Sequence, residues 1–269
     1  KTLTFILSFI SIKEIPNYCF YNCSSLKSIS MASVRSIGAC AFYQCGSLTA
    51  IDIPEGVTTI RDATFYCCYN LASVTIPNTV TSIGVEAFSG CSSLTSLVIP
   101  DSVTEIGQFA FSECRSLQTV TISKSITEIM SYTFRSCVNL TSVVIPDGVT
   151  YIEDYAFYYC EALTSVTIPA SLTKIRSNAF GSCNMLEDVY YEGSLSEWIQ
   201  INFEDYYSCP GTINAKSSKL YIGGELVEHL VIPDGTLYLL DYSFFFGSIK
   251  TVSLSDDLVY IATNTFTTL

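Results

Sequence analysis

Apolar and polar positions recur along this chain with a period of 22 to 23 residues. In each period a phenylalanine, a cysteine and a leucine follow one another at intervals of three residues. The cysteines of this register are Cys23, Cys45, Cys68, Cys91, Cys114, Cys137, Cys160 and Cys183. Three registers that stay locked over eight units predict a stack of equivalent repeats, because self-similarity at a period of about 20 to 50 residues is typical of a solenoid.

One full period, residues 140–163, predicts four elements in order. Val143 and Ile145 alternate with outward positions, the period-two pattern of a strand with one buried face. Pro146-Asp147-Gly148 is typical of a turn, and a second short extended segment follows it. From Ile152 onward, apolar residues fall at positions 0, 4, 8 and 11, which indicates one face of a short helix. Since no single unit buries its apolar face alone, the pattern predicts a stacked α/β solenoid.

The repeats predict one domain over residues 1–269, with about ten to eleven units of 22–23 residues. The 22–23-residue period breaks off after Leu186 and resumes at Val227. The residues in excess of whole repeats lie at about 190–226. We interpret that segment as an elaborated repeat inside the solenoid, because it is too short to have a core of its own.

The segment 190–226 has local signals of its own. Ser194-Leu-Ser-Glu197 has the form of a capping box, and it predicts a short helix through Trp198 and Ile201. Gly223-Gly224 lies between two short apolar runs, as in a hairpin. Trp198 is open to two interpretations: an exposed ligand contact, or a cap on the neighbouring core, which we favour.

The amino-acid sequence of the repeats resembles that of a known family. Ser-Leu-Thr-Ser-Leu-Val-Ile-Pro-Asp-Ser-Val-Thr-Glu-Ile-Gly-Gln-Phe-Ala-Phe at 93–111 and Ala-Leu-Thr-Ser-Val-Thr-Ile-Pro at 162–169 are similar to the BspA-type leucine-rich repeat. The resemblance covers about 1–189 and 227–269. It implies a right-handed, horseshoe-like leucine-rich-repeat solenoid, of the kind found on secreted or surface proteins of host-associated bacteria and some protozoan parasites. Several relatives are adhesins for host matrix or plasma proteins, and no catalytic residue comes with the resemblance.

Charge narrows the set of partners. The chain has 25 acidic and 13 basic residues and a net charge of −12. A surface of that sign repels phosphate, so we expect neither nucleic acid nor an anionic membrane as a partner. No apolar run approaches the ~20 residues of a transmembrane helix. The apolar run Leu3–Leu7 fits the strand of a preceding repeat better than a signal peptide. Uncapped solenoid ends leave association between copies open.

Twelve cysteines raise the question of disulfides or metal. Equivalent side chains on neighbouring rungs point the same way, so their Cβ atoms should stay ~5 Å apart, rather than the ~3.8 Å that a disulfide prefers. We therefore predict that the eight cysteines of the repeat register are buried and reduced. Cys19, Cys40, Cys67 and Cys209 lie outside that register, and their redox state stays open. No CxxC pair or Cys/His cluster suggests zinc, and no cofactor is expected.

Catalytic chemistry has little support. A Ser-His-Asp or Cys-His site would have to use the single histidine, His229, which lies in a strand-like stretch and is expected to point outward. Neither a P-loop nor a GxGxxG motif is present. We expect that the chain is not an enzyme, and the alternative is a hydrolase site within 190–226.

The candidate functional surface is the concave face, formed by outward residues of the longer strands. It is flat, nearly neutral and rich in serine and threonine. The candidate residues are Ser73, Thr75, Ser96, Val98, Thr119, Thr121, Ser142, Val144, Ser165, Thr167, Asp188 and Tyr190. Two hypotheses stay open: an extracellular or cell-surface module that binds a host or matrix protein or a glycan, and a structural spacer with no ligand of its own. Tyrosines gather near the predicted helix, where packing explains them as well as binding does.

Overall fold

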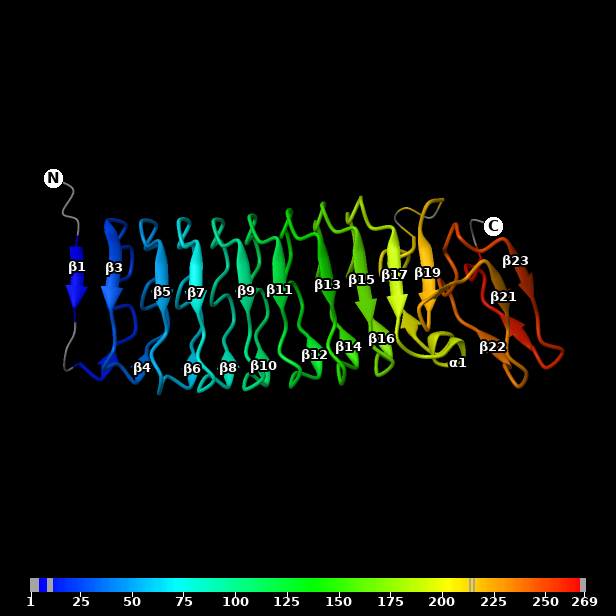
Figure 1. Ribbon diagram of the computed structural model, residues 1–269, viewed down its shortest axis with the longest axis horizontal. Coiled ribbons are helices and arrows are strands. Elements are labelled where there is room, and N and C mark those ends of the chain that lie inside the picture. The colour runs from blue at the N-terminus through cyan, green and yellow to red at the C-terminus, as the bar shows by residue number, and fades with distance from the viewer. Residues whose placement is uncertain (1–4, 9–11, 213, 215, 267–269) are drawn as a thin grey trace.

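The computed structural model describes residues 5–8, 12–212, 214 and 216–266, and residues 5–8 by their backbone. The chain coils into a stack of similar turns that extends along one axis (Figure 1). Each turn contributes one longer and one shorter strand, and each kind pairs in parallel with its equivalent about one repeat away. The prediction of a solenoid is confirmed.

The longer strands form one row. We call the outward surface of this row the long-strand face. Buried aliphatic residues alternate with exposed ones along it, as in β13 (Ser142–Val144), where Val143 is buried. The other strands of the row are β1 (Phe5–Ser8), β3 (Leu26–Ser30), β5 (Ala50–Asp52), β7 (Ser73–Thr75), β9 (Ser96–Val98), β11 (Thr119–Thr121), β15 (Ser165–Ile168), β17 (Asp188–Tyr191) and β19 (Lys219–Ile222).

The shorter strands form a second row, the short-strand face. Each has two residues, of which the second is apolar and, in β14 (Tyr151–Ile152), fully buried. The others are β2 (Glu14–Ile15), β4 (Ser36–Ile37), β6 (Thr59–Ile60), β8 (Ser82–Ile83), β10 (Glu105–Ile106), β12 (Glu128–Ile129), β16 (Lys174–Ile175) and β18 (Asn202–Phe203). Below the row in Figure 1, tight bends lead from these strands into the rest of each repeat.

The short helix expected in every repeat is wrong, and the fold is mostly β. In the seventh repeat Tyr155 and Tyr159 have left-handed φ angles of 57° and 63°, which a helix does not allow. The Phe157 N–H donates to the Ala179 carbonyl of the next repeat at 2.8 Å, while the Tyr158 N–H donates to Tyr155 at 3.1 Å. Successive N–H groups thus donate alternately to a carbonyl of the next repeat and to a carbonyl of the same repeat. The segment is therefore a series of tight turns and not a helix.

The same pair of left-handed residues, four positions apart, recurs throughout the stack. Its members are Tyr18 and Asn22, Cys40 and Gln44, Ala63 and Cys67, Glu86 and Gly90, Phe109 and Glu113, Tyr132 and Ser136, and Asn178 and Ser182. We call the outward surface of these segments the turn face. Among the described residues the only helix is α1 (Leu195–Trp198), which lies in the insertion.

The core is a column of phenylalanine rings beside a column of thiols. Rings of neighbouring repeats stack, with centroids 5.6 Å apart between Phe111 and Phe134 and 5.4 Å between Phe134 and Phe157. We call the eight cysteines of the repeat register the ladder thiols. Those from Cys45 to Cys183 each donate to the phenylalanine carbonyl of the preceding repeat, as Cys160 does to Phe134 at 3.3 Å. Burial raises the pKa of the Cys160 thiol well above its usual value. The cysteines therefore act as small apolar residues with one weak hydrogen bond.

The prediction of buried, unbridged ladder thiols holds for seven of the eight. Cys23 is exposed, because no earlier turn segment within the described residues lies against it. The cysteines outside the register are also free: Cys19 is exposed, Cys40 and Cys67 are half-buried, and Cys209 is buried.

The insertion folds back onto the stack. Ser194 and Glu197 form the predicted capping box at the start of α1, which confirms that prediction. Trp198 is fully buried, and its indole N–H donates to the Ser243 carbonyl at 2.9 Å. The structural interpretation of Trp198 is therefore confirmed.

After the insertion the longer-strand row changes character. β19 turns at Gly223-Gly224 into β20 (Glu225–Leu226), and the antiparallel pair confirms the predicted hairpin. The repeat pattern then resumes with the parallel pairs β21–β23 and β22–β24. Their bounds are β21 (His229–Val231), β22 (Tyr238–Leu239), β23 (Thr251–Ser253) and β24 (Tyr260–Ile261).

Candidate functional site

The structure brings all twelve candidate residues onto the long-strand face. They occupy equivalent outward positions on β7, β9, β11, β13, β15 and β17. The parallel register aligns Ser96 with Thr119 and Val98 with Thr121. It likewise aligns Thr167 with Tyr190. The candidates thus form two straight columns across six strands.

Exposure along these columns is high at the centre and lower toward β17. Val98 and Val144 are 64% and 61% exposed, so two aliphatic side chains lie among the serines and threonines of the face. The serine and threonine candidates on β7, β9, β11 and β13 are also exposed, whereas Ser165, Thr167 and Asp188 are half-buried. The face therefore offers short side chains with two apolar points and no deep cavity.

Two residues outside the candidate set complete the face at its β19 end. Lys219 aligns with Asp188, and its ammonium lies 3.4 Å from that carboxylate. The Asp188 charge raises the pKa of Lys219. Tyr221 aligns with Tyr190, and the two rings stack with centroids 4.6 Å apart. The Tyr221 hydroxyl also donates to Asp188 at 3.4 Å.

These two residues were missed because 31 residues separate Asp188 from Lys219 in the chain. The signal was present in the sequence: Leu220 and Ile222 have the alternation of the other long strands, which makes Lys219 and Tyr221 outward positions. The long-strand face thus ends in a paired tyrosine platform beside an ion pair.

A shallow hollow of about 350 Å³ lies at the edge of this face, over β11 and β13. Thr121 and Val144 line it, together with Lys124, Asp147 and Glu192 from the adjoining loops. Charged groups of both signs therefore border the otherwise neutral centre of the face.

His229 points outward on β21, as expected. Its Nδ1 lies 2.8 Å from the Thr251 hydroxyl on β23, and its ring is exposed. No cysteine, serine nucleophile or carboxylate is bonded to it among the described residues. The contact is a cross-strand hydrogen bond between neighbouring outward positions.

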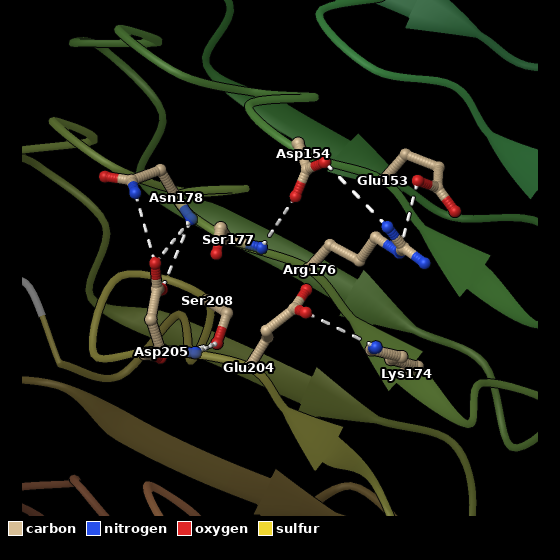
Figure 2. A network of polar contacts seen from close by, with 9 residues as sticks. All are labelled: Glu153, Asp154, Lys174, Arg176, Ser177, Asn178, Glu204, Asp205 and Ser208. Atoms are coloured by element: carbon tan, nitrogen blue, oxygen red, sulfur yellow. Dashed lines mark hydrogen bonds and ion pairs between the residues drawn. The ribbon is translucent and has the colours of Figure 1, made fainter.

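A network of polar contacts lies along the short-strand row, beside β14, β16 and β18 (Figure 2). Arg176 lies between two carboxylates, with Nε 3.3 Å from Glu153 and Nη1 4.0 Å from Asp154. Lys174 pairs with Glu204 at 3.5 Å. Burial raises the pKa of Glu153, and the Arg176 charge offsets part of that effect.

Aspartates in this network also hold backbone N–H groups of the adjoining repeat. Asp154 accepts from the Ser177 N–H at 3.1 Å. Asp205 accepts from the N–H of Asn178 at 3.2 Å and from its side-chain amide at 3.1 Å. Since these carboxylates are engaged by cations and N–H donors, the network ties successive repeats together and offers no free ligand set (Figure 2).

The described part of the chain has neither a metal-binding cluster nor a membrane-spanning helix. Within it, no three His, Cys, Asp or Glu side chains converge closely enough to hold a metal ion. Over the same residues, no helix combines the length and apolar character needed to cross a bilayer.

Two rows of parallel strands, a phenylalanine column and a turn segment in place of a helix define the protein as a leucine-rich-repeat solenoid. The repeats match the BspA type leucine-rich repeat region in six copies, over residues 2–106 and 81–211. The chain belongs to this family.

Solved structures with similar folds include three leucine-rich-repeat proteins. One from T. pallidum is 32% identical and covers 59% of this chain and 77% of its own, with a TM-score of 0.55. One from Bacteroides ovatus is 24% identical, with coverages of 95% and 82% and a TM-score of 0.51. A leucine-rich cell surface protein from Faecalibacterium prausnitzii is 30% identical, with coverages of 71% and 72% and a TM-score of 0.41. A comparison with curated proteins finds no match.

Proposed function

We propose that this chain is the interaction module of a secreted or cell-surface protein, and that it binds a protein or glycan ligand across the long-strand face. The observation that carries the proposal is the pair of straight, exposed columns on six adjacent strands, with Val98 and Val144 bare at their centre. Interfaces between soluble proteins are about as apolar as the rest of the surface, so a flat, mostly polar face with two apolar points suits such a partner. Membership of the BspA-type family supports the extracellular location.

The shape of the face favours a large ligand. Six strands at a spacing of ~4.8 Å extend roughly 25–30 Å, a length suited to a protein surface or an extended chain. Small molecules prefer concave pockets that enclose most of their surface. The Tyr190–Tyr221 pair gives one end of the face a rigid aromatic contact, of the kind enriched at interfaces. The proposal involves no cofactor and no catalytic step.

A spacer role is the second candidate. It is favoured by the uniformity of the stack, in which short side chains repeat along the face. Polar groups of the face also bond to each other, as the Thr75 hydroxyl does by donating to the Asp52 carboxylate at 2.8 Å. A spacer would bind nothing through this face.

The test is a triple substitution, Thr121→Arg, Val144→Arg and Thr167→Arg, at outward positions of β11, β13 and β15. Outward substitutions of this kind should change stability little. A control with the same charge change of +3 is Glu128→Arg with Tyr151→Arg on the short-strand face, since the first adds two charges and the second one. Both proteins are compared with the unmodified chain on arrays of host matrix proteins and mucin glycans.

We expect the unmodified chain and the control to retain a partner that the triple variant loses. Equal binding by the unmodified chain, the control and the triple variant would show that the ligand does not bind the long-strand face. Absence of any partner on the arrays would favour the spacer. Thermal unfolding of each variant shows whether a loss of binding reflects a loss of folding.

A further inference from the structure

The turn face has two columns of stacked aromatic rings, of which one ends before the fourth repeat and the other begins after it. The first column contains Tyr21, Tyr43 and Tyr66, with ring centroids 4.7 and 4.6 Å apart. The equivalent position in the next repeat is Ser89. The stack therefore stops at Tyr66, and the far face of that ring has no aromatic neighbour on its own column.

The second column begins where the first has ended. Phe109 stacks on Tyr132 at 4.4 Å, and Tyr132 stacks on Tyr155 at 5.0 Å. One repeat before Phe109, the equivalent position is occupied by Glu86. The fourth repeat is thus the only one between residues 18 and 155 that places no aromatic ring in either column.

The interruption leaves a hollow of about 490 Å³, the turn-face hollow. Tyr66, Cys67, Tyr69, Glu86 and Phe109 line it, together with the small residues Ser89, Gly90, Ser92 and Ser112. Gly90 has a φ of +75°, and a Cβ there would lie 2.9 Å from the Cys67 Sγ. The volume is within the range of small-ligand sites, about 300–1,000 Å³.

Charged residues also line the hollow. Glu113 pairs with Arg115 at 3.0 Å and with Arg135 at 3.3 Å, and all three side chains remain accessible to solvent. Two of the five arginines in the chain therefore lie in this hollow. With Glu86 included, two positive and two negative groups line the hollow, so its formal charge is zero although the chain has a net charge of −12.

We propose that the turn-face hollow is a binding site for one pyranose residue of a neutral glycan. The C–H face of a sugar ring packs on the open face of Tyr66, whose electron-rich surface attracts polarised C–H groups. The sugar ring occupies the position that a tyrosine side chain would fill if residue 89 were not a serine. This position, at Ser89, is one repeat beyond Tyr66. Sugar hydroxyls donate to the carboxylates of Glu86 and Glu113 and accept from the guanidinium of Arg115, in charge-assisted hydrogen bonds.

The charges favour a neutral over an acidic sugar. An added carboxylate would meet arginines that Glu113 already neutralises, and it would be repelled by Glu86. The Tyr66 hydroxyl is protonated at neutral pH, where even an unperturbed phenol keeps its proton, and the neighbouring Cys67 and burial raise the pKa of Tyr66 further, to about 12. It is therefore a further donor to a sugar oxygen. This site is on a different face from the one proposed above, and neither proposal depends on the other.

The test fills the hollow with the residue that the column itself uses. Ser89→Tyr should continue the stack of Tyr21, Tyr43 and Tyr66 and occupy the sugar position while the fold persists. Tyr66→Ala removes the stacking ring. Tyr21→Ala, at the far end of the same column, is the matched control. Binding is first measured on an array of neutral and acidic oligosaccharides and then by titration with the best neutral oligosaccharide.

We expect selective binding of neutral glycans by the unmodified chain and the Tyr21→Ala control. Ser89→Tyr should abolish binding, and Tyr66→Ala should weaken it about tenfold. The triple arginine variant of the long-strand face should still bind the sugar. The proposal is overturned if no neutral glycan binds, if acidic glycans bind better, or if a folded Ser89→Tyr variant binds normally.

Discussion

Phe134 lies in the middle of the ring column, and its replacement by alanine tests whether the stack depends on that column. The side chain is fully buried between Phe111 and Phe157. Loss of its burial should cost about 1.5–3 kcal/mol. A residual cavity of roughly 50–100 Å³, at about 24 cal/mol per Å³, adds about 1–2.5 kcal/mol. The expected loss is therefore about 3–5 kcal/mol in the free energy of unfolding.

The cavity cannot close easily, because the neighbouring rings are held by their own repeats. The Phe134 N–H donates to Ala156 at 2.8 Å, and its carbonyl accepts the Cys160 thiol. These backbone contacts survive the substitution and hold the two adjacent repeats at their spacing. Relaxation should therefore recover only part of the lost packing.

The assay is urea unfolding followed by far-UV circular dichroism, with Phe20→Ala as the comparison. Phe20 stacks on Phe42 in the same column but is half-buried, so its replacement should cost clearly less. Repeat proteins can unfold in parts, so the calorimetric and van't Hoff enthalpies should be compared before a single free energy is assigned. A loss below ~1.5 kcal/mol for Phe134→Ala, or equal losses for the two variants, would refute the reasoning.

The remaining predictions concern the thiols, the turns and the overall shape. In the native state a thiol reagent should modify the exposed Cys19 and Cys23 quickly and the buried ladder thiols only in denaturant; rapid native labelling of Cys137 would contradict its burial. Burial raises the pKa of Cys137, so above about pH 8.5 the unfolded chain loses a proton that the folded chain keeps, and the free energy of unfolding should fall as the pH rises. Denaturant titrations should show a shallower fall for Cys137→Ala, by up to about 1.4 kcal/mol per pH unit, and an unchanged slope would count against this linkage. Ser136→Gly, at a φ of 58°, should leave stability equal or raise it by up to about 1 kcal/mol, whereas in a helix the same change costs about that amount; thermal melting decides between them. We infer that residues 1–269 form one elongated domain, and a compact two-body profile in solution scattering would argue otherwise.

The sequence by itself determined the repeat, the buried columns and the alternation of the long strands. These features follow from burial, which depends only on the spacing of apolar residues such as Phe134 and Cys137 along the chain. It also determined the Ser194 capping box and the Gly223-Gly224 hairpin, because each is closed by hydrogen bonds between residues that are near in the chain.

Only the tertiary structure decided how the turn segment folds. Apolar residues spaced at 0, 4, 8 and 11 suit one face of a helix, and they suit equally a chain of turns that places the same residues inward. The difference lies in where alternate N–H groups find acceptors, and for Phe157 and Tyr159 the acceptors belong to the next repeat. Local propensity contains no information about that acceptor in the next repeat. Within the stack, tyrosine therefore adopts a left-handed φ angle that is uncommon for a residue other than glycine.

The two candidate surfaces depend on the stack in the same way. Tyr221 joins Tyr190 only because the insertion returns the chain to the same row of strands. The turn-face hollow exists because Tyr66, Ser89 and Phe109, from three successive repeats, are brought to one surface. Each repeat specifies its own inward residues, since burial acts on them one by one, whereas an outward surface is shared between repeats and is defined only by their register.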